Sequence, residues 1–331
     1  PRRCRRRGQR AQDRRGEQEI TSPEFVLHAA RADIRSGRFI EQGRMDCLGI
    51  DIGGTTVKAA LLRDGQRIAT GISDPYERPD AVQVARAVAD AASRAGPVRP
   101  DRLGLCLPGA WDNTRGCIIA SVNVPGIIGS TPPSLLKSAG MDTSSIAVFT
   151  DAHAAAFEVY FTEQLAERLL AVSMGTGIGA AVIDPGGAQL LLSGRSSGHL
   201  GQIDCTVHEE GRDPPIGLDG GRGGLEAYCG LRALLDRYGG PPSSIVDRLR
   251  ETDAPLRALA RSLRIAHAMY RPAHIRLLGG IGSRLGPHLP ALRRLVEAEL
   301  TNLARSDWTL ACAGDEFGAA CGAARLAARA A

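Results

Sequence analysis

The sequence predicts an α/β protein of two duplicated lobes, because one pattern of apolar runs and glycine turns occurs in each half. In the first half, the apolar run 47–50 leads to Asp51-Ile52-Gly53-Gly54-Thr55-Thr56 and a second apolar run. In the second half, the apolar run 169–174 leads to Gly175-Thr176-Gly177-Ile178-Gly179 and another apolar run. Short apolar runs around glycine turns are typical of paired strands. Two such turns, one in each half, favour lobes that grip a polyphosphate from both sides.

A third strand is expected in each half. Residues 67–71 follow Asp64-Gly65, a pair that favours a tight hairpin turn, and residues 188–192 follow a second turn at 184–187. Each half is therefore expected to begin with a three-strand meander.

The first glycine turn offers groups that suit phosphate and magnesium. Gly53 and Gly54 are expected to expose backbone N–H groups, and Thr55 and Thr56 add hydroxyls, all of which suit phosphate oxygens. The Asp51 carboxylate at the strand end suits Mg²⁺ or its water shell. Glycine fits the turn because it allows positive φ without a steric penalty. An ordinary Gly-Gly hairpin explains this segment equally well, and the second glycine turn is what favours phosphate binding.

The two turns resemble a known pair of motifs. Gly49-Ile-Asp-Ile-Gly-Gly-Thr-Thr-Val-Lys58 and Gly175-Thr-Gly-Ile-Gly179 resemble the phosphate motifs of ROK-family sugar kinases, in the actin-like, ribonuclease-H-like ATPase superfamily. The resemblance runs from about Met45 to the C-terminus. It implies a two-lobed actin-like (ribonuclease H-like) ATPase fold with the active site in the interlobe cleft. The expected small lobe is 46–149 plus 315–331, and the expected large lobe is 150–314.

Composition indicates a globular protein without a nucleic-acid or membrane partner. The chain's 331 residues suggest two domains or one large one, and the formal net charge of +5 comes almost entirely from arginine. That bias reflects GC-rich coding more readily than nucleic-acid binding. The 8 cysteines are scattered without close pairs, which argues against a disulfide scaffold and suits a reducing compartment. No apolar stretch could span a bilayer, and we expect a cytoplasmic protein.

Residues 1–44 differ from the rest of the chain. Residues 1–15 are rich in arginine and almost free of apolar residues, so we expect a disordered N-terminal extension without function. Met45, directly before the first strand, resembles a natural start. Some ROK proteins are repressors with an N-terminal helix-turn-helix, but the helix-like piece 24–34 has no second helix beside it, which disfavours a DNA-binding role.

The next part of the first half predicts a helix and a strand. Asp80 can cap a helix over 81–95, which Gly96-Pro97 ends. The strand 103–107 leads to Gly109, which resembles the family's glycine turn beside the sugar. Asn123, before Val-Pro-Gly, resembles the family's sugar-lining loop, although a turn residue before proline is an equal alternative.

The next apolar run, 146–149, leads to Thr150-Asp151-Ala152 and a helix that is expected to reach about Arg168. Asp151 lies between the two glycine turns and matches the aspartate of the family's Asn-Asp-Ala motif, which takes the proton from the attacking sugar hydroxyl. The alternative is that Asp151 is only a helix N-cap. Thr150 replaces the usual asparagine, which puts one contact to a ring hydroxyl in doubt.

The sugar-facing motif departs further from the family. His199 stands where relatives have a sugar-binding glutamate, and Gln202 stands where they have a histidine. Many relatives bind a structural zinc through that histidine and three cysteines. The corresponding residues here are Gln202, Gly217, Asp219 and Gly224, none of which is a typical zinc ligand, so we expect no structural zinc.

The second half then predicts helices and a further glycine turn. Helices are expected over 225–238, 243–251 and 255–270, and Glu226 matches the family's sugar-contacting glutamate, with a helix first-turn carboxylate as its other role. The strand 274–278 leads to Gly279-Gly280, which resembles the family's adenosine-side turn. A last strand is expected over 308–313, followed by a helix to the end that packs on the first lobe.

These expectations combine into an ATP- and Mg²⁺-dependent sugar kinase. The resemblance implies that Asp51 lies near Mg²⁺, that Asp151 is the general base, and that the acceptor is the 6-OH of glucose or a glucose-like sugar. The altered pocket leaves two alternatives open, an amino-sugar kinase of the kanosamine type in secondary metabolism and a catalytically silent sugar sensor. A homodimer is possible because dimers are common among relatives.

Overall fold

The computed structural model describes residues 44–96, 99–112, 114–141, 145–192, 197–218, 220–304 and 307–330. The expectation of an N-terminal extension over 1–44 therefore falls, apart from Arg44, outside the described residues, and Asp219 of the proposed zinc-loop comparison does too.

The first sheet has the strand order β3-β2-β1-β4-β7. Strands β2 and β3 are antiparallel to their neighbours, whereas β4 and β7 run parallel to β1. The expected meander is present, and its second turn has positive φ at Asp64 (48°) and Gly65 (78°), as a two-residue hairpin requires. The strands are β1 (Asp46–Ile52), β2 (Val57–Arg63), β3 (Gln66–Ile72), β4 (Arg102–Cys106) and β7 (Ile146–Phe149).

The second sheet repeats this topology with the order β11-β10-β8-β9. Strand β9 is antiparallel to β8, and β10 and β11 continue in parallel on its other side. Its strands are β8 (Leu169–Met174), β9 (Ile178–Ile183), β10 (His274–Leu278) and β11 (Thr309–Cys312). A small two-stranded sheet, β5 (Ala110–Asp112) with β6 (Cys117–Ala120), lies apart from both.

The prediction of a third strand over 188–192 is wrong. Among the described residues no strand forms there, although Gln189 bridges to Ile183 and Leu190 N–H donates to the Val182 carbonyl at 2.8 Å. The Ser197 hydroxyl accepts from the Val182 N–H and donates to the Leu190 carbonyl, at 2.9 and 2.7 Å. A side chain therefore takes the place of backbone pairing where the ladder would continue.

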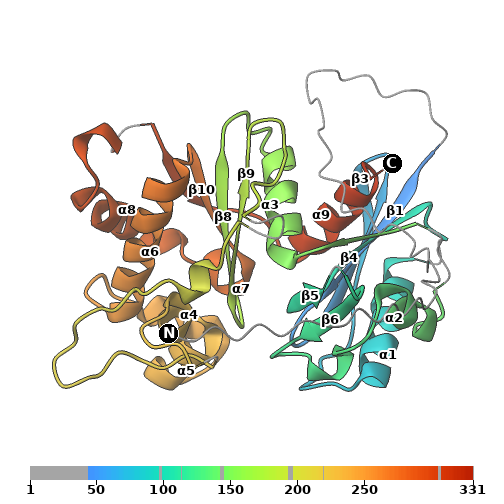
Figure 1. The fold of residues 1–331 in the computed structure, drawn as a ribbon. Coiled ribbons are helices and arrows are strands. Elements are labelled where there is room, and N and C mark those ends of the chain that lie inside the picture. Colours follow the sequence, from blue (N-terminus) through green and yellow to red (C-terminus); the bar gives the residue numbers. More distant parts are fainter. Residues whose placement is uncertain are drawn as a thin grey trace, which may run out of the picture.

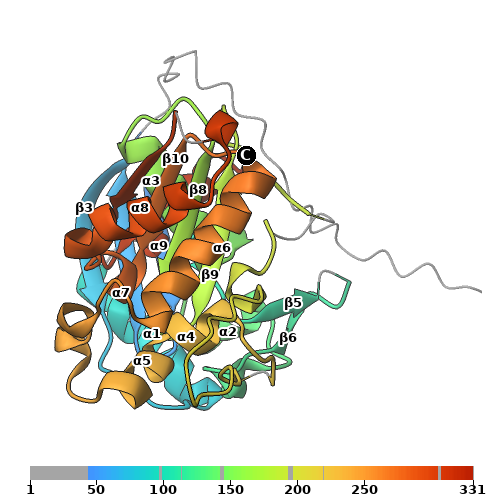
Figure 2. The ribbon, with the colours of Figure 1, turned by 90° about the vertical axis from the view of Figure 1, so that its left-hand side faces the viewer.

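Each sheet has its own core. On one face of the first sheet, α1 (Ala81–Ala95) and α2 (Pro132–Ser138) bury alternate residues of β1, such as Leu48 and Ile50. The opposite face of β1 carries Gly49, where α9 (Gly318–Ala327) packs so closely that a Cβ would lie 1.8 Å from the Ala320 carbonyl oxygen. Figure 2 shows α6 and α8 over the outer face of the second sheet. The helices of this half are α3 (Asp151–Thr162), α4 (Leu225–Cys229), α5 (Leu231–Tyr238), α6 (Ala254–Tyr270), α7 (Gly279–Gly282) and α8 (Leu289–Ala298).

Helix bounds differ from the expectations at three places. The helix after β7 ends at Thr162 rather than near Arg168, because Gln164 adopts φ 52° and Leu165 N–H bonds back to the Tyr160 carbonyl. The helix over 225–238 is divided at Gly230, whose ψ of 152° is extended. The expected helix 243–251 is two short 3₁₀ turns. The 3₁₀ turns are Pro125–Ile127, Leu200–Gln202, Pro242–Ser244, Val246–Arg248, Gly286–His288 and Asn302–Ala304.

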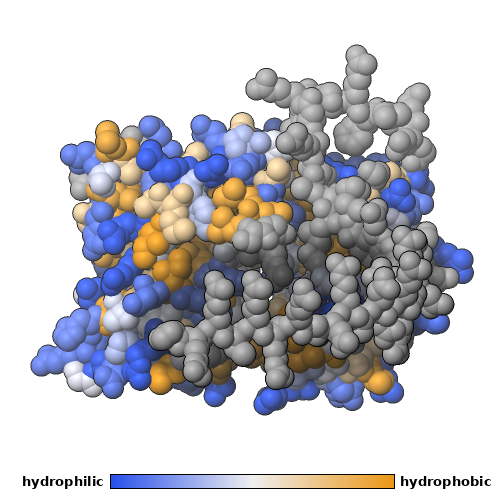
Figure 3. Space-filling view, viewed as in Figure 1, coloured by the Kyte–Doolittle hydropathy of each residue, from blue (hydrophilic) through white to orange (hydrophobic). Residues whose placement is uncertain are grey.

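The two halves meet along α3 and α9, which lie side by side between the sheets in Figure 1. A Cβ on Gly322 of α9 would lie 1.8 Å from the Ala154 carbonyl oxygen of α3, so only glycine permits this crossing. We propose the small lobe 46–149 plus 315–331 and the large lobe 150–314 on this basis. On the face drawn in Figure 3, apolar patches are interspersed with hydrophilic residues. No helix within the described residues has the length and apolar character to cross a membrane.

Candidate active site

Two carboxylates lie at one edge of the first sheet. Asp51 near the end of β1 is in register with Cys106 at the end of β4, and Cys106 is in register with Phe149 at the end of β7. Asp151 follows Phe149 after a single residue and begins α3. Because β1, β4 and β7 are parallel, Asp51 and Asp151 share the carboxyl edge, where ligands of open α/β sheets bind.

Asp51 lies on the same face of β1 as Gly49, where α9 packs, but two residues closer to the end of the strand. Lys58 is its direct cross-strand partner on β2, so the two side chains share a face. Burial raises the pKa of Asp51 to about 7, repulsion from Asp151 adds to this, and Lys58 opposes it. The strand register and the effect of Asp151 on the pKa of Asp51 both indicate that the two carboxylates are neighbours.

Asp151 is exposed to solvent, yet surrounding protein removes enough hydration to raise the pKa of its carboxyl group. A side chain that is both accessible and closely surrounded lies in a concave part of the surface. The alternative of Asp151 as an N-cap is wrong, because the Thr150 hydroxyl caps α3 by accepting from the His153 N–H at 3.2 Å. Burial lowers the pKa of His153 to about 4, so its imidazole is neutral at pH 7.

The first glycine turn is held by its carbonyl groups. Gly53 N–H donates to the Thr56 carbonyl at 3.0 Å, and the Tyr76 hydroxyl donates to the Gly53 carbonyl at 2.6 Å. The expectation of positive φ is wrong here, since neither Gly53 nor Gly54 adopts it. Limited space favours glycine instead: a Cβ on Gly53 would lie 2.9 Å from the Thr56 carbonyl oxygen, and one on Gly54 would lie 3.0 Å from Asn123 Cβ. The turn therefore lies against the loop that carries Asn123.

The second glycine turn lies against α3 and α4. Gly175 N–H donates to the Gly177 carbonyl at 3.0 Å, and Glu226 accepts from the Ile178 N–H at 2.8 Å. A Cβ on Gly179 would lie 3.1 Å from Ala152 Cβ, next to Asp151. The structure thus brings both turns to the two carboxylates, the first through Asp51 and the second through Ala152.

The third glycine turn adjoins the second. Gly279 has φ 79°, and a Cβ there would lie 2.6 Å from the Met174 carbonyl oxygen at the end of β8. Gly280 faces open space instead. Because β8 and β10 are parallel neighbours, these two turns also share one carboxyl edge.

The residues expected to contact the sugar differ from one another in burial and in hydrogen bonding. Asn123 is half-buried against the first turn, and Gly109 adopts φ 102° with no room for a Cβ beside Ala120. Glu226 points its carboxylate at the second turn, and the Thr150 hydroxyl is engaged by the helix cap. His199 and Gln202 are exposed at either end of one 3₁₀ turn.

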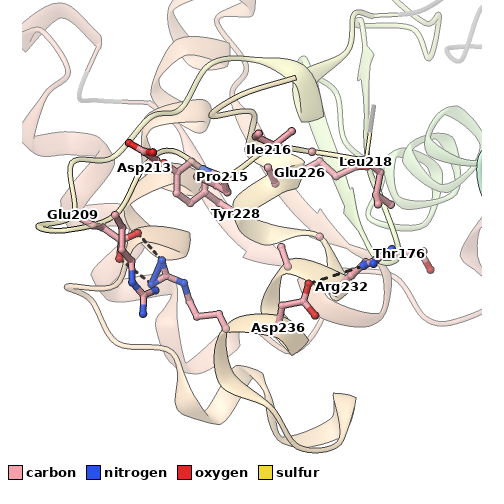
Figure 4. A pocket seen from close by; sticks show the side chains of 16 residues that line it. Thr176, Glu209, Asp213, Pro215, Ile216, Leu218, Glu226, Tyr228, Arg232 and Asp236 are labelled. Atoms are coloured by element: carbon pink, nitrogen blue, oxygen red, sulfur yellow. Dashed lines mark hydrogen bonds and ion pairs between the residues drawn. The ribbon is translucent and has the colours of Figure 1, made fainter. Parts of the chain in front are cut away.

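A cavity of about 430 Å³ opens beside Thr176 and Glu226 (Figure 4). It lies between the loop 209–218 and helices α4 and α5, and Ile216 and Leu218 provide apolar surface on the loop side. Its charged residues include two ion pairs, Arg237 with Glu209 and Arg232 with Asp236, and acidic residues outnumber basic ones among those that line it. The lining therefore offers both hydrogen-bond donors and acceptors, and it does not carry the net positive charge that would favour an anion.

The glycine-rich loop near this cavity is held by backbone bonds. Gly217 N–H donates to the Gly221 carbonyl at 2.7 Å, and Gly223 N–H donates to the Pro215 carbonyl at 2.8 Å. Cys205 N–H in turn donates to the Gly223 carbonyl, which ties the loop to the chain after Gln202. Among the residues that the structure describes, no three His, Cys, Asp or Glu side chains are grouped to hold a metal.

The residues present fit a magnesium nucleotide. In the described part of the chain, the backbone N–H groups of Gly54, Thr55, Thr56, Thr176 and Gly177 have no protein acceptor. Unpaired N–H groups in two glycine turns suit phosphate oxygens, and a carboxylate with a raised pKa suits a divalent cation.

Sequence reasoning missed two residues of this site. Lys58 was visible in the motif but had no assigned partner until the strand register placed it opposite Asp51. Tyr76 lies in an irregular Asp-Pro-Tyr segment, and no local pattern indicates its bond to Gly53.

Comparison with solved structures agrees with this architecture. The ROK hexokinase from Thermus thermophilus is 26% identical, with 86% of this chain and 98% of that one covered and a TM-score of 0.63. The ROK-family glucokinase from Streptomyces griseus, solved with glucose and AMPPNP, is 20% identical, with coverage of 86% and 99% and a TM-score of 0.69. A ROK-family transcriptional regulator, a homologue of the E. coli MLC protein, is 17% identical, with coverage of 86% and 78% and a TM-score of 0.63. No curated protein sequence matched the chain.

The family comparison covers almost all of the described chain. The ROK family model matches residues 47–330, a range that contains both sheets and all three glycine turns. The neighbouring structures include sugar kinases of the actin-like ATPase fold. The chain therefore belongs to the ROK family and has that family's actin-like ATPase fold.

Proposed function

We propose that this protein transfers the γ-phosphoryl group of ATP to a hydroxyl of a hexose, namely the 6-OH of glucose or a glucose-like sugar. The observation that carries the proposal is that strand register puts Asp51 and Asp151 at one edge of the first sheet, each next to a glycine turn with unpaired N–H groups. The hexokinase and glucokinase among the similar structures support the same reaction class.

Each group has a distinct role in this mechanism. The N–H groups of Gly54, Thr55, Thr176 and Gly177 donate to phosphate oxygens from both lobes, and Gly279-Gly280 approaches the adenosine side. Asp51 would hold the magnesium ion, which neutralises phosphate charge when it is bound. Asp151 accepts the proton of the attacking hydroxyl, and its raised pKa makes it a stronger base at neutral pH.

In this proposal the sugar would be surrounded by six residues, namely Gly109, Asn123, Thr150, His199, Gln202 and Glu226. Glu226 also accepts from the Ile178 N–H, so it couples the sugar pocket to the second turn. No zinc is required in this proposal, because backbone hydrogen bonds hold the loop 215–223.

The test is ADP release with Mg-ATP and a panel of glucose, mannose, N-acetylmannosamine, glucosamine and 3-amino-3-deoxyglucose. Asp151→Asn should lower kcat by about a thousandfold, because a general base contributes that order of rate. Asp247→Asn is a matched control, since Asp247 is exposed in a 3₁₀ turn of the large lobe. Equal turnover by wild type and Asp151→Asn would contradict the assigned base.

The second candidate is a kinase for an amino sugar. The engaged Thr150 hydroxyl and the exposed imidazole of His199 favour it, because both alter the polar groups offered to the ring. A kcat/KM for 3-amino-3-deoxyglucose well above that for glucose would select this candidate. Sugar binding without ADP release from any sugar would instead identify a silent sensor.

A further inference from the structure

The segment 73–76, directly after β3, lies behind the first glycine turn and bonds to it repeatedly. Ser73 N–H donates to the Val57 carbonyl, and the Ser73 hydroxyl accepts from the Val57 N–H, both at 2.9 Å. Tyr76 N–H donates to the Thr55 carbonyl at 2.8 Å, and the Tyr76 hydroxyl donates to the Gly53 carbonyl at 2.6 Å. The segment therefore fixes the backbone of the turn from Gly53 to Val57.

These bonds engage the carbonyl groups of the turn and leave most of its N–H groups without a partner among the described residues. The carbonyls of Gly53, Thr55 and Val57 accept from the segment, and the Thr56 carbonyl accepts from Gly53 N–H. A carbonyl oxygen repels an anion, whereas an N–H attracts it. Holding the carbonyls on the protein side leaves the N–H groups available on the opposite side.

The peptide between Gly53 and Gly54 depends most on this arrangement. In a trans peptide the C=O and the N–H point in opposite directions, so fixing the Gly53 carbonyl also fixes the direction of the Gly54 N–H. Neither residue has a Cβ to hinder rotation of this peptide. Within the described residues, the Tyr76 hydroxyl is the donor to the Gly53 carbonyl. Rotation of the peptide would break this bond and turn the carbonyl toward the phosphates.

Tyr76 is well placed to act as this donor. Its ring is half-buried against the core of the small lobe, which fixes the position of the hydroxyl. Burial and the nearby Asp51 carboxylate raise the pKa of Tyr76, so its hydroxyl stays protonated and continues to donate.

We propose that Tyr76 is a positioning residue for the nucleotide phosphates, whose hydroxyl holds the Gly53–Gly54 peptide with the Gly54 N–H directed into the cleft. This proposal rests on the proposed function, since it deepens the role of the first glycine turn.

The test is Tyr76→Phe, which removes the hydroxyl and keeps the ring. Calorimetry should show about fivefold weaker binding of Mg-AMP-PNP, as expected for the loss of one hydrogen bond. Binding of adenosine, which lacks phosphates, should not change, and kcat/KM for ATP should fall by a similar factor. Tyr160→Phe is the matched control, because the Tyr160 hydroxyl accepts from the Gly186 N–H at 3.2 Å in a turn of the large lobe. That variant should bind both ligands as the wild type does.

The outcomes separate this inference from the kinase assignment. If the wild type binds Mg-AMP-PNP and Tyr76→Phe binds it equally well, the role of Tyr76 is wrong and the proposed function stands. Equal weakening of adenosine and AMP-PNP would indicate general disruption and also overturn the inference. A wild type that binds no nucleotide would overturn both proposals.

Discussion

Asp51 and Asp151 place two negative charges at one edge of the first sheet, with one lysine opposite them. Burial and repulsion raise the pKa of Asp51 to about 7, and burial raises that of Asp151. A divalent cation displaces a proton held in this way, because its charge outweighs the cost of ionisation. The nucleotide-free site is therefore a source of pH-dependent instability.

We predict that ionisation of Asp51 makes the nucleotide-free protein lose stability as the pH rises from about 4 to about 7. The pKa of Asp51 is raised from an ordinary value of 3.8, so the folded state binds its proton more tightly than the unfolded state does. Stability from this group is therefore higher at pH 5 than at pH 8. Asp51→Asn cannot ionise, so it should gain stability relative to wild type between pH 5 and pH 8. Urea unfolding midpoints at both values measure this difference.

Asp46→Asn is the control for this prediction. Arg63 lowers the pKa of Asp46, so the stability that Asp46 contributes is lost only at low pH. The difference between wild type and Asp46→Asn should stay constant from pH 5 to pH 8. A constant difference for Asp51→Asn as well would show that the raised pKa of Asp51 is wrong.

Individual residues of the site were predictable where a short sequence motif contains them. The glycine turns and both aspartates lie within short motifs, and strand ends place them without knowledge of distant contacts. The reason for glycine was not predictable, because the space at Gly54 is limited by Asn123, far along the chain. The bond from Tyr76 to Gly53 joins an irregular segment to a turn, and it depends on where the whole lobe packs.

At the scale of elements, backbone bonds support the described residues of the glycine-rich loop, 215–218 and 220–223. Its crossing bonds, Gly217 N–H to Gly221 and Gly223 N–H to Pro215, close a small hairpin, and Ile216 also bridges to Arg222. Such bonds satisfy the loop's backbone groups without a bound ion.

We predict that chelation leaves the stability of the nucleotide-free protein unchanged. Incubation with EDTA should shift the thermal midpoint by less than about 1 °C, because we propose that backbone bonds rather than metal–ligand bonds hold this loop. Elemental analysis should find far less than one zinc per chain, and added zinc should not raise the midpoint. A stoichiometric zinc, or a clear fall in the midpoint on chelation, would contradict this prediction.

Elements were predictable from sequence where local signals agree. The helix 81–95 and its Asp80 cap were expected, and both are present with a full capping box. The C-terminal end of α3 was not, because its left-handed residue is Gln164 rather than glycine. The strand expected at 188–192 does not form, because the Ser197 hydroxyl bonds to the Val182 N–H and the Leu190 carbonyl, which would otherwise pair with each other. Sequence patterns near the strand do not indicate this contact.

At the scale of the whole molecule, α3 and α9 form the junction between two separate cores. Arg325 of α9 makes a two-bond ion pair with Glu158 of α3, at 2.8 and 3.1 Å, and donates to the Gly65 carbonyl at 2.9 Å. Its guanidinium also lies over the Phe161 ring. Movement of the lobes during catalysis would therefore pivot about a charged contact that is almost entirely shielded from water.

We predict a large coupling between Arg325 and Glu158, because their side chains are only 9% and 13% exposed. Arg325→Met or Glu158→Leu alone should each lower the free energy of unfolding by about 3 kcal/mol, since each leaves an unpaired buried charge. The double variant should lose clearly less than the sum, because it leaves neither charge unpaired. Urea unfolding of the four proteins measures the coupling. The surface pair Arg293 and Glu297 on α8, 48% and 31% exposed, is the control and should show a coupling of at most about 0.5 kcal/mol. Additive losses at Arg325 and Glu158 would mean that helix packing alone, through Gly322 and Ala154, holds the lobes together.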